Sequence, residues 1–323
     1  MKTNIRAALA ALSVAAAGFA PAAHAQELSI ATGGTGGVYF PYGGGMAEVI
    51  NRHVEGFTAT AEVTGAGVEN MNLIAAGETD LALVLSDTLL AAFTGTGPFE
   101  GAPIPEARTM IGIYPNAVQI VTLAGSGITS LADLRGQRVS VGAPGSGTEV
   151  SAQTILAANG ITYDDFEPQR LNFNETADAL RDGTIAAGFW SVGPPTSSIM
   201  NLAATREIAL LAMTEEEIAA AIDAEPTFAP YTLRAGVYDG VADPVPSIST
   251  PNMVVVHADM DDDLVYAITK AIFDHVDELI AIHPAANDTV PEFTLAASPI
   301  PLHPGAIRYF EEIGMTIPDR MRP

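Results

Sequence analysis

The sequence predicts an α/β protein with mostly parallel sheets, folded as two lobes. Short strand-like runs alternate with segments of helical spacing along the chain, an order typical of α/β layers. The length of 323 residues suits one large domain or two of ordinary size. Pro115-Asn116 lies between two extended runs, and this break together with the length favours two lobes over one. Ligands bind to such folds beyond the carboxyl ends of strands.

The first 25 residues predict a Sec-type signal peptide. Lys2 and Arg6 precede the apolar run "AALAALSVAAAGFA", and small residues at Ala23 and Ala25 predict cleavage before Gln26. The alternative, a retained membrane anchor, is disfavoured because the run is short. We therefore expect an exported protein without stable membrane insertion, located in the periplasm of a Gram-negative cell.

The region up to position 124 predicts three strand–helix pairs followed by extended chain. Strands are expected over 27–33, 57–65 and 81–85, and helices over 39–54, over 67–80 and from Ser86 onward. Ser86 or Asp87 can cap the third helix. A loop rich in proline and glycine is expected over 94–107, with two extended segments after it, over 109–115 and 117–124.

The region after position 130 continues the alternation. We expect a short helix and a strand within 130–143, a helix over 150–160, and further segments over 174–183, 184–190, 195–204, 207–213 and 214–224. Thr214 and Glu217 form a capping box that predicts a helix for the last of these. A strand over 246–258, one long helix over 261–283 and a tail of turn followed by helix complete the chain.

The composition excludes several classes of partner. The chain has no cysteine, which excludes disulfides, a thiol nucleophile, Cys-ligated metal and a lipoprotein anchor. After removal of Lys2 and Arg6 with the signal, 12 basic residues face 38 acidic ones, a net charge of −26. Nucleic acid and anionic membranes are therefore poor partners. Solubility or a salty environment explains the acidity better than a charge-based function does.

Three segments share the design of strand, small-residue turn and helix start: 31–39, 84–88 and 141–149. Glycine lets a ligand approach bare N–H groups, and a helix start adds unpaired donors and partial positive charge. Such loops can bind an anion without Lys or Arg. Any one of them could also be a simple tight turn. A fourth turn follows Trp190, which either lines a cleft or packs between lobes.

Catalytic and nucleotide-binding motifs do not fit these loops. Gly142 and Gly147 have Walker A spacing, but Thr148 replaces the required lysine. The first loop fails the dinucleotide pattern because Tyr39 stands at the third glycine. Ser146 lies in G-S-G rather than G-x-S-x-G, no histidine lies in a glycine loop, and no HxxxH or HxH spacing occurs. We expect no catalysis, no cofactor and no metal.

Several blocks of the sequence match one family. "ATGGTGGVYFPYGG" (31–44), "AGVENMNLIAAGETDLALVLSD" (66–87) and "SLADLRGQRVSVGAPGSGTE" (130–149) resemble the TAXI-type solute receptors of tripartite TRAP transporters. The similarity runs from about Leu28 to the C-terminus and includes "LRAGVYDG" and "PIPLHPGAIRYFEEIGM". Leu85 replaces a usual glutamine, and Leu233-Arg234 stands where Ile-Pro is usual.

The resemblance implies a type II periplasmic binding protein fold, with two lobes that close on a solute about a hinge. It implies delivery to a membrane permease driven by a cation gradient. The ligand class it implies is a small carboxylate or amino acid such as glutamate, glutamine or 2-oxoglutarate. We expect a monomer, with lobe 1 formed by 26–116 plus 249–323 and lobe 2 by 117–248.

Ligand carboxylates are expected at Thr35–Gly37 and at Gly145–Thr148. The complete set of expected ligand contacts is Thr35, Gly36, Gly37, Tyr39, Ser86, Asp87, Asn116, Gly145, Ser146, Gly147, Thr148 and Trp190. Asp87 either binds a ligand ammonium group or caps its helix. Two alternatives to transport remain, an exported hydrolase that uses the same cleft and a ligand-sensing subunit of a membrane receptor.

Overall fold

The computed structural model describes residues 26–323, so the expected signal peptide lies outside the described residues. One ten-stranded sheet runs through the molecule in the order β2-β1-β3-β10-β4-β7-β5-β6, with β8 beside β4 and β9 beside β10. The strands are β1 (Gln26–Ala31), β2 (Phe57–Glu62), β3 (Leu81–Leu85), β4 (Ala107–Leu123), β5 (Arg138–Ser140), β6 (Glu167–Gln169), β7 (Ala187–Val192), β8 (Ile208–Leu210), β9 (Ala229–Leu233) and β10 (Val245–His257).

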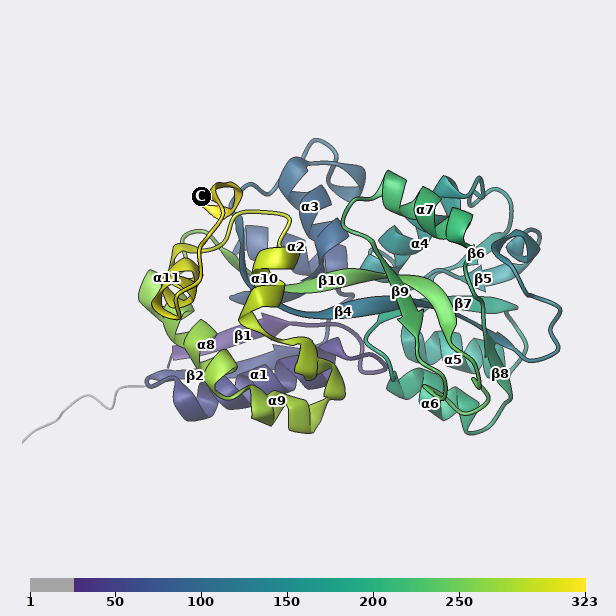
Figure 1. The fold of residues 1–323 in the computed structure, drawn as a ribbon, viewed down its shortest axis with the longest axis horizontal. Helices are drawn as coiled ribbons and strands as arrows, with labels where there is room; N and C mark the ends of the chain where they lie inside the picture. The colour runs from purple at the N-terminus through teal and green to yellow at the C-terminus, as the bar shows by residue number, and fades with distance from the viewer. Residues whose placement is uncertain (1–25) are drawn as a thin grey trace, which may run out of the picture.

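Helices cover the sheet along its length (Figure 1). They are α1 (Tyr39–His53), α2 (Gly67–Ala76), α3 (Ser86–Thr94), α4 (Gly147–Ala158), α5 (Phe173–Arg181), α6 (Ser197–Ala203), α7 (Glu215–Ala224), α8 (Asp262–Asp274), α9 (Val276–Ile282), α10 (Pro291–Ala297) and α11 (Pro304–Glu312). Short 3₁₀ turns cover Gly97–Phe99, Leu131–Leu134, Pro284–Asp288 and Asp319–Met321. The predicted capping box of Thr214 and Glu217 is confirmed at the start of α7.

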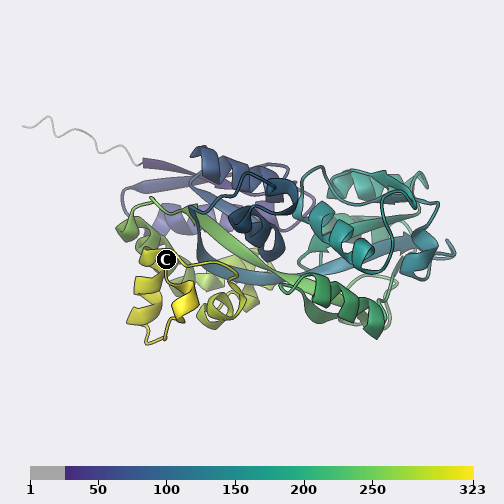
Figure 2. The same ribbon diagram turned by 90° about the horizontal axis from the view of Figure 1, so that it is seen from above.

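Two long antiparallel strands, β4 and β10, join the two ends of the molecule. Figures 1 and 2 show one end built from β1–β3 with α1–α3 and α8–α11, and the other from β5–β7 with α4–α7. We call these the β1–β3 end and the β5–β7 end. Parallel pairs form within each end, whereas β10 with β3 and β4 with β7 are antiparallel. The expectation of mostly parallel sheets is therefore wrong at the centre.

The expected break at Pro115-Asn116 is also wrong, because β4 is one continuous strand of 17 residues. Pro115 lies opposite Pro251 of β10, and the register shifts immediately after Pro251. Proline has no N–H group to donate within a β-ladder. Two prolines that face each other at this register shift therefore leave no backbone N–H group without a partner. The sequence shows each proline but not that the two face each other.

The expected single helix over 261–283 is two helices, because the backbone leaves helical geometry at His275. The break allows α9 to turn and pack against α1. Gly45 of α1 leaves room there, since a Cβ at that position would lie 2.5 Å from Ile282 Cδ1. Three short elements were not expected at all: β6, β9 and α10. Each has seven residues or fewer and each contains a proline.

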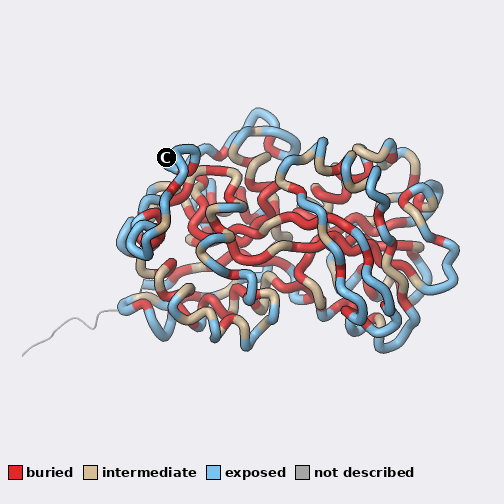
Figure 3. The backbone as a smooth tube through the Cα atoms, in the orientation of Figure 1, coloured by how far each residue is buried: buried red, intermediate tan, exposed pale blue. Residues whose placement is uncertain are grey.

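The core follows the central sheet. Figure 3 shows buried backbone concentrated along the strands, with exposed residues on the outer helices and loops. β3 is buried at all five positions, as its apolar run predicts. Within residues 26–323, the helices are too short or too polar to span a membrane.

Asn70 of α2 fixes the loops that leave the ends of β1 and β3. Its fully buried side chain donates Nδ2 hydrogen bonds to the carbonyl oxygens of Thr32 at 2.7 Å and Leu83 at 2.8 Å. Its Oδ1 accepts a hydrogen bond from Thr64 Oγ1 at 2.6 Å. One amide group therefore connects β1, β3 and the loop after β2.

We expect Asn70→Ala to lower the free energy of unfolding by about 2–4 kcal/mol, because buried carbonyl groups lose their donor. Urea unfolding measures this loss. Asn201→Ala is the control, because Asn201 is exposed and its change should stay within about 0.5 kcal/mol. Equal stability of the two variants would contradict the structural role of Asn70.

Candidate functional site

A cavity of about 260 Å³ lies between the two ends of the molecule. Its walls come from loops beyond the carboxyl ends of β1, β2, β3, β5, β6 and β7 and from β4, as expected for an α/β fold. The lining residues are Gly33, Gly34, Gly37, Val38, Tyr39, Val63, Thr64, Gly65, Ala66, Gly67, Leu85, Asn116, Ala143, Ser146, Gly147, Thr148, Asn172, Phe173, Ser191 and Val192.

Half of the twelve residues expected from the sequence line this cavity. The structure brings together Gly37, Tyr39, Asn116, Ser146, Gly147 and Thr148. It places Thr35, Gly36, Ser86, Asp87, Gly145 and Trp190 outside the lining. Sequence reasoning missed the turn 63–67, although Gly65 and Gly67 there form a fourth strand–glycine–helix segment. It also missed Phe173 and Ser191, which no motif distinguishes.

The start of α4 offers two free backbone donors to the cavity. Ser146 is the N-cap, and its Oγ accepts the N–H of Glu149 at 3.2 Å. The N–H of Gly145 donates to Glu149 Oε2 at 2.7 Å. Within the described chain, no hydrogen bond engages the N–H groups of Gly147 and Thr148. The anion site expected over 145–148 therefore reduces to these two donors, at the positive end of the helix.

The first glycine loop instead packs against the β5–β7 end. The carbonyl of Gly36 accepts hydrogen bonds from Ser197 Oγ at 3.3 Å and from Ser198 N at 3.4 Å. A Cβ on Gly36 would lie 2.4 Å from Asn174 Oδ1 and 3.2 Å from the Asn174 nitrogen, so a larger residue there would displace the Asn174 side chain. Thr35 is exposed and accepts a hydrogen bond from Asn174 Nδ2 at 3.4 Å. The Thr35 hydroxyl and the Gly36 carbonyl thus contact the β5–β7 end.

A second contact closes the opposite rim of the cavity. The N–H of Val68 donates to the carbonyl of Gly145 at 2.9 Å, which explains why Gly145 faces away from the lining. Gly67 has a φ of +31°, and a Cβ there would lie 2.5 Å from the nitrogen of Gly147. The close contacts between the two ends at both rims of the cavity therefore involve glycines.

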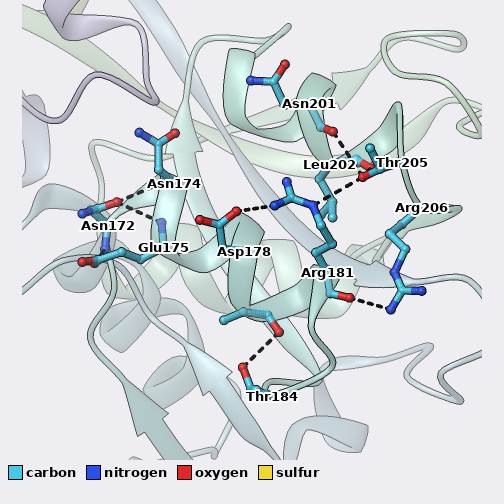
Figure 4. Close-up of polar contacts among 11 residues, drawn as sticks. Asn172, Asn174, Glu175, Asp178, Arg181, Thr184, Asn201, Leu202, Thr205 and Arg206 are labelled. Atoms are coloured by element: carbon cyan, nitrogen blue, oxygen red, sulfur yellow. Dashed lines mark hydrogen bonds and ion pairs between the residues drawn. The ribbon is translucent and has the colours of Figure 1, made fainter.

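Phe173 forms one wall of the cavity at the first position of α5. Figure 4 shows the capping box at the start of this helix, in which Asn172 Oδ1 accepts the N–H groups of Asn174 and Glu175 at 3.0 Å each. In return, the N–H of Asn172 donates to Glu175 Oε2 at 2.9 Å. This reciprocal cap fixes the position of the aromatic ring.

Trp190 lies behind Phe173 and not in the cavity wall. It is fully buried, its ring stacks on that of Phe173 at 6.0 Å between centroids, and its Nε1 donates to Ser198 Oγ at 3.1 Å. Of the two alternatives open for Trp190, the geometry corresponds to packing.

Asp87 connects α3 to α4. Its Oδ2 accepts the hydroxyl of Ser151 at 2.8 Å, and its Oδ1 accepts the hydroxyl of Thr88 at 3.1 Å. Leu85 and neither Ser86 nor Asp87 is the N-cap residue of α3, but Asp87 Oδ1 accepts the backbone N–H of Thr88 in the first turn, so the expected capping by Asp87 is met in part. Burial raises the pKa of Asp87 to about 6, against the opposing effect of the bonds from Ser151 and Thr88. Neither Asp87 nor Ser86 reaches the lining.

Two buried polar atoms in the cavity wall have no partner among the described residues. They are Asn116 Oδ1 and Ser191 Oγ, in side chains that are 2% and 5% exposed. Asn116 Nδ2 donates to the carbonyl of Ser191 at 2.9 Å, which sets the amide so that Oδ1 is the free acceptor. Thr148 Oγ1 accepts the N–H of Ser191 at 3.3 Å and holds β7 against the start of α4.

The twenty lining residues include no carboxylate, imidazole, amine or guanidinium group. The hydroxyl of Tyr39 donates to Asn252 Oδ1, and burial followed by the charge of Asp87 raises the pKa of Tyr39 well above its usual value. The phenol therefore stays protonated at neutral pH. The cavity can bind through backbone donors, amide and hydroxyl oxygens and apolar walls.

A cluster of possible metal ligands lies elsewhere, on α1 and at the start of α9. His53 Nε2 lies 2.8 Å from Glu278 Oε1, and His275 lies beside them. The two imidazoles stack at 3.5 Å between centroids and 8° between planes, so their lone pairs do not converge on one point. Arg52 donates to the other Glu278 oxygen at 2.7 Å. This geometry is that of an ion-pair cluster.

Comparison with known proteins gives a consistent family and fold. A model described as "NMT1-like family", the TAXI/TRAP-type family, matches residues 30–314. The structure of PhnD1 from Prochlorococcus marinus (MIT 9301) in complex with methylphosphonate is similar, with 9% identity, a TM-score of 0.56, and coverage of 82% of this chain and 91% of that one. A protein from Bordetella bronchiseptica RB50 has 17% identity, a TM-score of 0.53, and coverage of 91% and 90% respectively. The predicted type II periplasmic binding protein fold is confirmed.

The raised pKa of Asp87 predicts a pH-dependent stability. Because the pKa is near 6 in the folded protein and lower in the unfolded chain, stability is full below about pH 4 and falls as pH rises through 6. The difference is worth about 3 kcal/mol. Asp87→Asn removes this titration, so the stability of the variant relative to wild type should rise by about 2–3 kcal/mol between pH 4 and 7.5.

Chemical denaturation at both pH values measures this change. Asp133→Asn should change little over this interval, because hydrogen bonds from Thr129 and Ser130 lower the pKa of Asp133 below 3.8, and its titration therefore lies below pH 4. A relative stability of Asp87→Asn that does not vary with pH would refute the buried titration.

Proposed function

Because the chain belongs to the NMT1-like family, the TAXI/TRAP-type family of periplasmic solute-binding proteins, we propose that it captures a small carboxylate or amino acid for a cation-coupled TRAP permease. The chain is a periplasmic solute-binding protein of a transporter. We propose in addition that its partner is a TRAP permease and that its ligand is a carboxylate.

One observation carries the ligand proposal. The cavity between the two ends holds the unpaired N–H groups of Gly147 and Thr148 at the positive end of α4. Such a helix start binds a carboxylate without a basic side chain. The cavity is smaller than the roughly 300–1,000 Å³ of sites for drug-sized ligands, which favours a small solute.

We further propose that the β1–β3 end and the β5–β7 end are the two lobes, with boundaries near 116–117 and 248–249. Pro115 and Pro251 face each other at this crossing, where neither can donate to the ladder. A ladder with fewer hydrogen bonds bends at lower cost than a complete one. The glycine contacts at both rims of the cavity then form and break as the lobes close and open.

Native mass spectrometry of freshly purified protein tests the ligand class, because a tightly bound solute is retained. Uptake tests the partner. Membrane vesicles that contain the cognate TRAP permease should accumulate the solute only with added protein and an imposed cation gradient, and without ATP. Uptake that requires ATP and ignores the gradient would exclude the TRAP partnership.

Gly147→Asp tests the anion site at α4. A carboxylate placed at the free N–H groups should weaken binding of the solute on the order of 100-fold by repulsion and occupation of the donors. Gly147→Ala is the control for the size of the new side chain, because a Cβ in either variant meets the flexible Leu85 side chain at 2.6 Å. The difference between the two variants then measures the effect of the added charge.

Calorimetry on both folded variants gives the comparison. Gly44→Asp is a control for added charge, since a Cβ at Gly44 meets nothing within 4 Å. If Gly147→Asp binds the solute no worse than Gly147→Ala, the carboxylate does not sit at α4.

A further inference from the structure

We infer that a second cavity, on the face of β4 opposite to the first, controls the equilibrium between open and closed lobes. As the lobes open, this cavity narrows and brings Arg234 against Asp288, which favours the open form. The inference rests on the two lobes of the proposed function and goes beyond its ligand. Three observations carry it: the position of the second cavity, its walls from both ends, and two unpaired opposite charges.

The second cavity has a volume of about 240 Å³ and lies beside the crossing of the two long strands. Pro115 of β4 lines it, whereas the next residue, Asn116, lines the first cavity. Neighbouring side chains of a strand point to opposite faces of the sheet. The two cavities therefore lie on opposite faces of β4, at the crossing where Pro115 faces Pro251.

Both ends of the molecule supply walls to the second cavity. Asn287 and Asp288 come from the 3₁₀ turn that follows α9, in the β1–β3 end. Thr232 lies in β9 and Arg234 directly after it, and β9 pairs with residues 245–249 of β10, in the β5–β7 end. A rotation about the crossing that separates the walls of the first cavity brings the walls of the second together, because the two cavities lie on opposite sides of the axis.

One hydrogen bond already joins the ends at the edge of the second cavity. His283 Nδ1 accepts the N–H of Ala285 at 3.1 Å, so Nε2 carries the proton and donates to the carbonyl of Pro195 at 3.2 Å. The ends thus touch at this point while the cavity beside it stays open. A contact of this kind can serve as the pivot about which the walls approach each other.

Arg234 and Asp288 are the charged residues of this lining, and they come from different ends. Within residues 26–323, neither side chain makes an ion pair or a hydrogen bond, and burial without a cationic partner raises the pKa of Asp288. Burial also raises the pKa of Tyr231, the charge of Asp288 raises it further, and the charge of Arg234 lowers it. Both charges therefore act on the same hydroxyl, and a narrower cavity lets them pair.

The distance across the first cavity, measured by double electron–electron resonance, tests the inference without any solute. The chain has no cysteine, so Asn72→Cys on α2 and Gln153→Cys on α4 give two specific sites for spin labels, both exposed. These helices begin at the rim where Val68 bonds to Gly145. Protein stripped of bound solute by denaturant and refolded should show a long distance for open lobes and a less populated short distance for closed lobes.

Exchange of the two charges tests the pair. Arg234→Asp alone gives the cavity two carboxylates, which oppose its narrowing, and should raise the ratio of closed to open lobes about twofold to fivefold. Arg234→Asp combined with Asp288→Arg restores opposite charges and should return the ratio to that of wild type. This rescue separates the charge pair from a packing role, which an exchange of side chains would not restore.

Thr232→Trp tests the space. Thr232 is exposed and lines the second cavity, so an indole there fills the cavity without entering the core. It should raise the ratio of closed to open lobes about tenfold, because a filled space resists compression. Thr58→Trp is the matched control, since Thr58 is also exposed but lies on β2, at the far edge of the sheet. Asn287→Trp fills the cavity from the other end and serves if Thr232→Trp folds poorly.

Three results would overturn the inference. The solute-free wild type could show one distance only, the exchanged charges could fail to restore the ratio, or both cavity-filling variants could match Thr58→Trp. The first of these would also refute the two moving lobes. Because no measurement here uses a solute, the outcome is independent of the calorimetry that tests the carboxylate.

Discussion

The antiparallel pairing of β4 with β10 is the constraint on which the rest of the structure depends. Both strands run through the whole sheet, so each end of the molecule is built on the same two backbones. The short parallel strands on either side can then direct their carboxyl ends toward a common space. Neither end forms the whole cavity alone, because the lining draws on loops from both. The position of the site is thus a consequence of topology before any side chain is considered.

Glycine makes the second contribution, through the absence of side chains where the two ends meet. A Cβ at Gly67 would lie 2.5 Å from the backbone nitrogen of Gly147 and would push the ends apart, whereas a Cβ at Gly36 would displace the Asn174 side chain. The glycines that the sequence analysis assigned to ligand binding therefore have two different roles. Gly147 at α4 and Gly33, Gly34 and Gly37 before α1 line the cavity, whereas Gly36 contacts the β5–β7 end. A sequence motif cannot distinguish these tasks, since both require a backbone that can be closely approached.

The sequence predicted the fold well wherever a local signal decided the structure. The wholly apolar run of β3 and the capping box of α7 are of this kind. The sequence-based prediction was wrong where contacts between residues distant in the sequence determine the structure. The helix break at His275 depends on packing against α1, and the continuity of β4 depends on Pro115 facing Pro251. The site shows the same division. Half of the expected contacts line the cavity, because strand ends and helix starts can be recognised from neighbouring residues. The hydrogen bond between Asp87 and Ser151 joins residues far apart in the sequence and could not be predicted in this way.

The electrostatics of the chain fit a cavity of this design. A protein with 38 acidic residues and 14 basic ones can hardly collect several arginines in one pocket. Helix dipoles and backbone N–H groups provide positive potential without changing the net charge. At the start of α4 the N–H groups of Gly147 and Thr148 have no hydrogen-bond partner among residues 26–323. They supply positive potential beside a cavity that no basic side chain lines.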